Sequence, residues 1–357
     1  MSDSDNIGER KAQHLEICSD ESQYEVERGS TLLDKVHFVH RSLPELNEDE
    51  IDTGSEFLDH AVAMPLFISS MTGGSEGGYA VNKQLAQVAQ RVGIPVGMGS
   101  IRILFRKPEV MDHFLLKPFA QDVPVFANIG GVQLRSDELG PLVELLKRLE
   151  VDGVAVHLNP GQELVQPEGD RDFRGVLNGI KRLCEVSPVP VIVKETGFGV
   201  AVSEVESLVQ AGATYVDIAG RGGTNWITVE GYRLTGEAQA VADEFGGWGN
   251  PTGPTLAALR DYRGTILASG GIRTGMDVAK ALALGAESVG MALPFVRSIR
   301  EGGIDGGVAF AHRIRQVLRY AMLLCGARTL EELRAAPLVL GSEFRSYTAQ
   351  LKNIGSR

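Results

Sequence analysis

The most specific chemical pattern in the sequence is ASGGIRTGMDVAKALALGAESVGMAL, residues 268–293. It consists of a short apolar run, a glycine-rich turn, an amphipathic helix-length segment and a second apolar run. Adjacent glycines let the backbone approach an anion closely, and the N–H groups at the start of a helix favour negative charge. The pattern therefore predicts a phosphate-binding turn around Gly271 and Arg273.

A second group of polar side chains follows the apolar run GVAV, which begins at residue 153. His157, Asn159, Gln162 and Glu163 occur within seven residues, with a proline and a glycine between them. Taken alone, His157 is equally compatible with a hydrogen-bonded histidine of the core. So many polar groups at the end of a buried strand instead indicate one contribution to a shared site.

Positioning these groups requires a regular scaffold, and the sequence contains a repeated strand-helix pattern. Amphipathic segments with helical spacing lie at 79–93, 139–150, 202–212 and 276–286. The predicted strands cover 65–70, 95–100, 123–130, 153–159, 190–195, 214–220, 264–270 and 288–293. Eight such units in roughly 250 residues are typical of a TIM barrel. A doubly wound sheet is the structural alternative, but FISSMTGGSEGG after the first strand does not fit its glycine fingerprint.

The fold prediction is an α/β chain with a TIM (β/α)8 barrel over residues 61–357. Residues 1–60 form a charged N-terminal extension. Residues 221–254 form a long glycine-rich insertion after the sixth strand, and a connection of this length suggests a lid or a binding element.

The active site of a TIM barrel lies at the carboxyl ends of its strands. Singly, Ser100, Asn128 or Thr224 would be a turn residue or a cap, and Lys194 a solvated strand end. Their convergence on one face favours a common site. The residues at or just beyond the predicted strand ends are Met71, Thr72, Gly73, Ser100, Arg102, Asn128, His157, Asn159, Lys194, Thr224, Gly271, Arg273, Ala292 and Leu293.

Composition excludes several classes of protein. The 357 residues are 43% hydrophobic and 23% charged, as in ordinary globular proteins, and the net charge of −11 argues against binding to nucleic acid or an anionic membrane. Cys18, Cys184 and Cys325 are odd in number and far apart, which argues against a disulfide or zinc framework. No signal peptide or membrane-spanning run is visible, so a cytoplasmic location is expected.

The stretch SGGIRTGMDVAKALALGA resembles the FMN-phosphate site of flavin-dependent TIM barrels. The α-hydroxy-acid oxidases of this group need a histidine near the end of the sixth strand, and the inosine monophosphate dehydrogenases need a cysteine in the loop that follows. The corresponding IAGRGGTNW has neither. The motifs RKAQHL, SSMTGG, MGSIR, FANIG, HLNPGQELVQPEGDRDF, KETGFG and GRGGTNW are instead similar to those of type 2 isopentenyl diphosphate isomerases over nearly the whole chain. Ile101 departs from the polar residue expected at its position.

The resemblance implies FMN as a cofactor, held by residues at the strand ends. Those that would line the flavin are Met71, Thr72, Gly73, Ser100, Asn128, Lys194 and Thr224. Those that would hold its phosphate end are Gly271, Ile272, Arg273, Ala292 and Leu293.

The resemblance also implies a diphosphate substrate. Arg10, Lys11 and Arg102 would hold the diphosphate, and Glu163 would bind Mg²⁺. Without the resemblance, RKAQHL would be read as a solvated tail helix. Gln162 would lie near the reacting carbons. Further active-site candidates are His14, His157, Asn159, Trp226 and Glu230.

The implied activity is the interconversion of isopentenyl and dimethylallyl diphosphate, with reduced FMN as an acid–base cofactor, NADPH as reductant and an N-terminal extension that contributes to the substrate site. A homo-tetramer or homo-octamer is the implied assembly. An FMN-dependent oxidoreductase that acts on a small anionic substrate is the alternative. A catalytically silent flavin- or phosphate-binding barrel is a third reading, because fold alone does not decide function.

Overall fold

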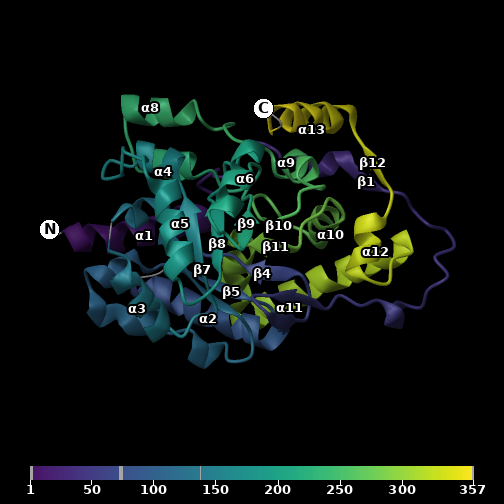
Figure 1. The fold of residues 1–357 in the computed structure, drawn as a ribbon, viewed down its shortest axis with the longest axis horizontal. Coiled ribbons are helices and arrows are strands. Elements are labelled where there is room, and N and C mark those ends of the chain that lie inside the picture. Colours follow the sequence, from purple (N-terminus) through teal and green to yellow (C-terminus); the bar gives the residue numbers. More distant parts are fainter. Residues whose placement is uncertain (1–2, 72–74, 137, 356–357) are drawn as a thin grey trace.

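Eight short parallel strands close into a barrel at the centre of the folded molecule (Figure 1). The computed structural model describes residues 3–71, 75–136 and 138–355. The strands follow sequence order around the barrel, and the last pairs with the first. They are β4 (Leu66–Ile68), β5 (Val96–Ser100), β6 (Val125–Gly130), β7 (Gly153–Leu158), β8 (Val191–Glu195), β9 (Tyr215–Asp217), β10 (Thr265–Ala268) and β11 (Ser288–Met291). The predicted TIM barrel is confirmed, and each strand lies within its predicted segment.

The strands are apolar because both of their faces are covered. The residues of β4, β6 and β8 are all buried, as expected of parallel strands between a filled barrel interior and an outer ring of helices. Gly97 in β5 is required by this packing, since a Cβ there would stand 2.5 Å from the ring of Phe126.

Helices form the outer ring around the barrel. They include α2 (Glu76–Val92), α3 (Gly140–Arg148), α5 (Val176–Val186), α6 (Val202–Gln210), α9 (Thr252–Ala258), α10 (Gly275–Ala283) and α11 (Leu293–Cys325). The β5–β6 connection instead contains the 3-10 helices η3 (Ile101–Phe105), η4 (Pro108–His113) and η5 (Lys117–Phe119). A further 3-10 helix, η6 (Gly131–Arg135), follows β6.

The N-terminal extension reaches both ends of the barrel. Its helix α1 (Asp3–Ser19) contacts α2, α11 and α7 (Trp226–Gly231), which lie around the carboxyl ends of the strands. Its hairpin β2–β3 (Ser55–Phe57 and His60–Val62) closes the other end, where Phe57 packs against Phe67, Phe126 and Tyr215. The segments η1 (Leu33–Lys35), β1 (Val36–Phe38) and η2 (Glu48–Glu50) connect the two.

The insertion after β9 combines short helices with turns. It contains α7 and α8 (Glu237–Asp243) and leads into α9, and α7 packs against α8 and against the short helix α4 (Pro160–Val165). The insertion therefore places its first helix beside the polar turn that follows β7.

The C-terminal part of the chain completes the outer layer. After α11, which bends at Gly302–Gly303, come α12 (Leu330–Ala335), β12 (Leu338–Leu340) and α13 (Ser342–Gly355). Strand β12 pairs with β1, so the two terminal regions are joined. Within the described residues, no helix is both long and apolar enough to cross a membrane.

Candidate active site

A cavity that is open to solvent lies at the carboxyl ends of the barrel strands and beneath α1. Glu230 and Ile272 lie outside its wall, and Thr72 and Gly73 lie outside the described residues. The predicted site residues that line it are Arg10, Lys11, His14, Met71, Ser100, Arg102, Asn128, His157, Asn159, Gln162, Glu163, Lys194, Thr224, Trp226, Gly271, Arg273, Ala292 and Leu293.

One end of the cavity is a cradle of backbone. Gly271 has a φ of +74°, and a Cβ on Gly223 would stand 2.5 Å from the Gly271 nitrogen, so two backbone turns meet here without side chains. Helix α11 begins beside them, and its first residue follows Ala292, which makes no side-chain cap. Because Pro294 has no N–H and the Phe295 N–H donates to the Ala292 carbonyl at 3.1 Å, the glycine backbone is the feature of this region that best suits a phosphate.

Ile272 and Arg273, both predicted for this phosphate end, have different surroundings. Ile272 is fully buried in the hydrophobic core, so its side chain cannot touch a ligand. Arg273 does line the cavity, and its guanidinium forms a two-pronged ion pair with Glu27, with distances of 2.7 and 3.2 Å. Glu27 lies in the N-terminal extension, so the extension contacts this end of the cavity as well.

The middle of the cavity wall carries unpaired hydroxyls. Within the described part of the chain, neither Ser70 Oγ nor Thr196 Oγ1 has a hydrogen-bond partner, although both atoms are buried and both residues line the cavity. Buried polar groups normally find partners. These orphaned hydroxyls and the glycine cradle fit a polar ring system with a phosphate tail, as FMN is.

Lys194 is the buried cation of this wall. Burial lowers the pKa of Lys194, an effect that the nearby carboxylates of Asp217 and Glu195 oppose only in part. Its Nζ donates to the Glu195 carbonyl at 2.6 Å. Asp217 stands beside Lys194 on the neighbouring strand and accepts hydrogen bonds from Ser269 at 2.8 and 2.9 Å. Asp217 is thus a buried acidic group beside Lys194 that sequence patterns did not reveal.

The turn after β8 is built around the Glu195 carboxylate. Its Oε2 accepts backbone N–H groups from residues 196–199, among them Thr196 at 2.6 Å and Gly197 at 2.7 Å. This carboxylate therefore shapes the turn that carries the orphaned Thr196 hydroxyl.

His157 is a neutral member of the wall. Burial and the positive charges of Lys194, Lys11 and Arg102 lower the pKa of His157 to about 3. Its Nδ1 lies 3.0 Å from Asn128 Oδ1, so the neutral ring donates from Nδ1 and leaves Nε2 as an acceptor. At neutral pH this imidazole can accept a hydrogen bond, but it has no acidic proton to give.

Three cations gather in another part of the cavity wall. Arg10 and Lys11 come from α1, and Arg102 comes from η3. Burial, with the charges of Arg10 and Arg102, lowers the pKa of Lys11 to about 7. Arg10 forms an ion pair with Glu168 at 3.0 Å. Such a crowded positive cluster is suited to an anion that carries several charges.

Glu163 stands beside this cluster as a fixed carboxylate. Its Oε1 accepts from Asn159 Nδ2 at 3.1 Å, and its Oε2 accepts from the Asp170 backbone N–H at 2.8 Å. The backbone around it is clamped by Arg171, which donates to the carbonyls of Glu163 and Gln166. No group of three His, Cys, Asp or Glu side chains able to hold a metal occurs in the described residues. A single carboxylate next to a cluster of cations suited to phosphate fits Mg²⁺, which keeps waters and takes phosphate oxygens as further ligands.

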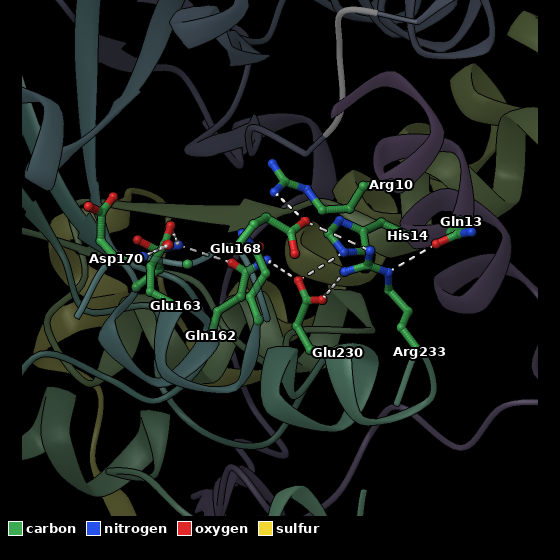
Figure 2. A network of polar contacts seen from close by, with 12 residues as sticks. Arg10, Gln13, His14, Gln162, Glu163, Glu168, Asp170, Glu230 and Arg233 are labelled. Atoms are coloured by element: carbon green, nitrogen blue, oxygen red, sulfur yellow. Dashed lines mark hydrogen bonds and ion pairs between the residues drawn. The ribbon is translucent and has the colours of Figure 1, made fainter. Parts of the chain in front are cut away.

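A chain of hydrogen bonds connects Glu163 to α1 (Figure 2). Asn159 Nδ2 also donates to Gln162 Oε1 at 3.1 Å, and Gln162 Nε2 donates to Glu230 Oε1 at 3.0 Å. His14 Nε2 reaches the same Glu230 oxygen at 2.9 Å. The edge of the His14 ring packs on Trp226, with 5.2 Å between ring centres. Five side chains of the predicted site are therefore joined in one chain of polar contacts: Glu163, Asn159, Gln162, Glu230 and His14.

Glu230 is fully buried and yet anionic. Burial raises the pKa of Glu230, but hydrogen bonds from His14 and Gln162 and the charges of His14 and Arg233 outweigh it and lower the pKa to about 2. It stands behind Gln162, one layer away from the cavity. Its carboxylate can act on a bound molecule only through its neighbours or after a shift of Gln162.

Several polar residues of the site were missed by sequence reasoning. Glu168, Arg171 and Gln166 lie inside the stretch HLNPGQELVQPEGDRDF, so attention to every polar residue of that motif would have found them. Arg233 follows Glu230 by three residues and has no signal in the sequence pattern.

Known proteins resemble this chain in sequence and in fold. The model of the FMN-dependent dehydrogenase family matches residues 161–339. The isopentenyl-diphosphate delta-isomerase of Borreliella afzelii is 42% identical over 338 residues, which is 94% of each chain. That of Thermococcus kodakarensis is 41% identical over 352 residues, or 96% of this chain and 93% of its own.

Solved structures support the fold. A flavocytochrome b2 variant with bound benzoylformate superposes with a TM-score of 0.66 at 18% identity, covering 94% of this chain and 80% of its own. At that identity the likeness shows a shared barrel and nothing about the reaction. The sequence identity to the isomerases extends over nearly the whole chain. The chain therefore belongs to the isopentenyl-diphosphate delta-isomerase family and contains an FMN-dependent dehydrogenase domain.

Proposed function

We propose that this protein interconverts isopentenyl diphosphate and dimethylallyl diphosphate, with reduced FMN as cofactor and Mg²⁺ on the diphosphate. The observation that carries the proposal is that two different groups suited to anions line one cavity. One is the cation cluster of Arg10, Lys11 and Arg102, and the other is the backbone cradle around Gly271. The cluster suits the substrate diphosphate, and the cradle suits the phosphate of FMN.

At the substrate end, Arg10, Lys11 and Arg102 would hold the diphosphate. Each charge-assisted contact of this kind is worth roughly 1.5–3 kcal/mol. Glu163 would bind Mg²⁺ through its carboxylate, whose direction is fixed by Asn159 and the Asp170 backbone. The metal and the three cations together would balance the substrate's charge inside an acidic protein.

At the cofactor end, bound reduced FMN would supply an electron-rich ring with exchangeable protons. Lys194 would stand next to this ring and favour its anionic form. The phosphate would lie among Gly271, Arg273, Ala292 and Leu293, with Ile272 contributing backbone only. The remaining contacts would come from Met71, Thr72, Gly73, Ser100, Asn128 and Thr224.

Between the two ends, Gln162 would face the reacting carbons. Its amide has no readily transferable proton, so its role would be to position the alkene and to connect it to Glu230. Glu230, anionic at neutral pH, would accept a proton or stabilise developing positive charge. His157 and Asn159 would hold the neighbouring groups in place, and His14 and Trp226 would close the pocket from α1 and α7.

The decisive experiment is an anaerobic incubation of the purified protein with isopentenyl diphosphate, FMN, Mg²⁺ and a catalytic amount of NADPH, followed by product analysis. The isomerase proposal expects dimethylallyl diphosphate far in excess of the NADPH consumed. NADPH consumption in step with product would establish the oxidoreductase alternative instead. Flavin binding without turnover of either substrate would leave only a binding barrel.

NADPH as the physiological reductant, a cytoplasmic location and a homo-tetramer or homo-octamer stay predictions from the resemblance and the composition. Light scattering of the purified protein would measure the assembly.

A further inference from the structure

Arg233 is a largely buried cation just beyond the end of α7, with 14% of its side chain exposed. A tight turn brings it back over the helix, because its backbone N–H donates to the Glu230 carbonyl at 2.9 Å. Arg233 is not among the described residues that line the cavity. It therefore does not touch a molecule in the cavity, and any effect on such a molecule passes through other residues.

The guanidinium of Arg233 contacts three side chains from three segments (Figure 2). Nη1 pairs with Glu230 Oε2, on the side away from the cavity. Nε donates to Gln13 Oε1 on α1 at 3.0 Å, and Nη2 lies 3.9 Å from Glu168 Oε1. Arginine suits this place because its planar fork aims several donors in fixed directions, which a lysine cannot do.

The two carboxylate oxygens of Glu230 thus contact different neighbours. Oε2 is taken by Arg233, and Oε1 faces Gln162 and His14 at 3.0 and 2.9 Å. Asn159 fixes the other end of the Gln162 amide by donating to its Oε1. With both ends fixed, the Gln162 amide has one orientation, with its Nε2 toward Glu230.

We propose that Arg233 is a positioning residue for the isomerisation. Its guanidinium holds the Glu230 carboxylate in line between Gln162 and His14, and so orients the Gln162 amide in the cavity. The contact with Gln13 connects this alignment to α1, which carries Arg10 and Lys11 toward the diphosphate end. This inference rests on the proposed function, because it names a residue that serves that reaction.

The charge of Arg233 also bears on the protonation of Glu230. The titratable groups that face Glu230 are His14 and Cys18 on α1 and Arg233 itself, with Arg10 and Glu168 one contact further away. Burial raises the pKa of Cys18 to about 12, so this thiol stays neutral. His14 and Arg233 are then the charges that keep Glu230 anionic. Removing Arg233 removes one of the causes that lower the pKa of Glu230, so Glu230 would take up its proton at a higher pH.

The test compares Arg233→Gln and Arg233→Lys with a matched control, Arg334→Gln. Arg334 also forms a partly buried ion pair, with Glu287 at 2.9 Å, but it lies on α12, away from the cavity. For each protein, kcat and KM are measured over a range of pH, together with FMN affinity and the melting temperature.

We expect Arg233→Gln to lower kcat by about tenfold to a hundredfold, as the loss of a charge-assisted contact implies, with FMN affinity unchanged. The acid limb of its kcat profile should move to higher pH. Arg233→Lys keeps the charge but not the planar guanidinium. The acid limb of its kcat profile should therefore lie closer to that of the wild type, while its kcat recovers only in part. The control Arg334→Gln should keep both kcat and the acid limb.

A double-mutant cycle with Glu230→Gln shows whether Arg233 acts through Glu230. If it does, Arg233→Gln should have little further effect on kcat in the Glu230→Gln background. Additive losses, or a lower melting temperature with an unmoved acid limb and no rescue by lysine, would overturn the proposal. If Arg233→Gln does not fold, the lysine variant and its cycle with Glu230→Gln decide the question. A wild-type protein that fails to isomerise refutes the proposed function instead, so the two failures are distinguishable.

Discussion

Nε2 of Gln162 lies 3.0 Å from Oε1 of Glu230, although the two residues are 68 positions apart in the sequence. Gln162 comes from the short helix after β7, and Glu230 comes from the insertion after β9. Because a buried carboxylate accepts from this amide nitrogen, the amide oxygen is directed to Asn159, whose Nδ2 also donates to the Glu163 carboxylate. The pairing gives one polar chain from Glu163 to Glu230.

This pairing predicts the behaviour of Gln162→Ala. The substitution removes a donor to a buried carboxylate, a contact worth roughly 1.5–3 kcal/mol. We expect kcat to fall by about tenfold to a hundredfold, while FMN binding and its reduction by NADPH persist, because no residue of the cofactor end is changed. Stopped-flow reduction and steady-state turnover measure the two effects separately. A variant that loses flavin reduction in parallel with turnover would contradict this division of roles.

Glu163→Gln tests the metal end. The amide keeps the size of the side chain but loses the charge that Mg²⁺ requires. We expect the Mg²⁺ concentration for half-maximal activity to rise at least about tenfold, with FMN affinity unchanged, since roughly 1.4 kcal/mol is one decade. The control is Asp172→Asn, in the same acidic loop but half exposed and paired with Arg174. Equal magnesium dependence in the two variants would remove Glu163 from the metal site.

The N-terminal cations give a third prediction. Changing both Arg10 and Lys11 to alanine should raise the substrate KM by at least about tenfold, because two charge-assisted contacts to the diphosphate are lost. Alanine favours a helix, so α1 should persist. Arg174→Ala, at an arginine side chain that is 90% exposed, is the matched control. If the double variant keeps the KM of the wild type, α1 is a solvated helix with no part in substrate binding.

The fold was predictable because the strands of a parallel barrel are buried on both faces. Short apolar runs at regular intervals, such as residues 123–130 and 190–195, carry that signal directly. The hairpin β2–β3, which closes the end of the barrel away from the cavity, has no such signal in the sequence. Its two strands have three residues each, and Phe57 becomes part of the core only through contacts with distant strands.

The site was predictable where residues follow a strand end or share a recognisable motif. His157 and Lys194 are adjacent on paired strands, so their proximity follows from the fold. Glu230 could not be placed in advance, because a carboxylate in a glycine-rich insertion is usually exposed to water. Its full burial depends on His14, Gln162 and Arg233, which come from separate segments, and no local pattern encodes such a meeting.

The pKa of Lys11 predicts a pH dependence of substrate binding. With this pKa lowered to about 7 by burial and by Arg10 and Arg102, Lys11 loses its proton above neutral pH in the free protein. A bound diphosphate favours the charged form, so binding takes up a proton there, and affinity falls as pH rises, by at most about tenfold per pH unit. Lys11→Arg stays charged and should lack this component. KM is measured against pH from about 6.5 to 9 for both proteins. Protonation of the substrate's own phosphate groups changes both profiles alike, so the difference between the profiles reports on Lys11. Parallel profiles would show that Lys11 does not titrate against the ligand.

The turn that carries Glu163 gives the last prediction, which concerns Gly169. A Cβ at Gly169 would stand 2.8 Å from the carbonyl carbon of Glu163 and closer still to its oxygen. Both obstacles are backbone, and the same carbonyl is clamped by Arg171, so the turn has to open to admit a methyl group.

Gly169→Ala should therefore displace Glu163 and its neighbour Gln162 together. We expect stability to fall by about 1–3 kcal/mol, as in other overpacked sites, with a loss of both magnesium activation and kcat. FMN affinity should be kept, because the cofactor end is built from other strands. The control is Gly140→Ala at the start of α3, where no described atom lies within 4 Å of the added carbon. Thermal unfolding, magnesium titration and FMN titration of the two variants give the three readouts. Normal magnesium activation in Gly169→Ala would mean that the turn tolerates the methyl group, and that the position of Glu163 does not depend on this close backbone contact.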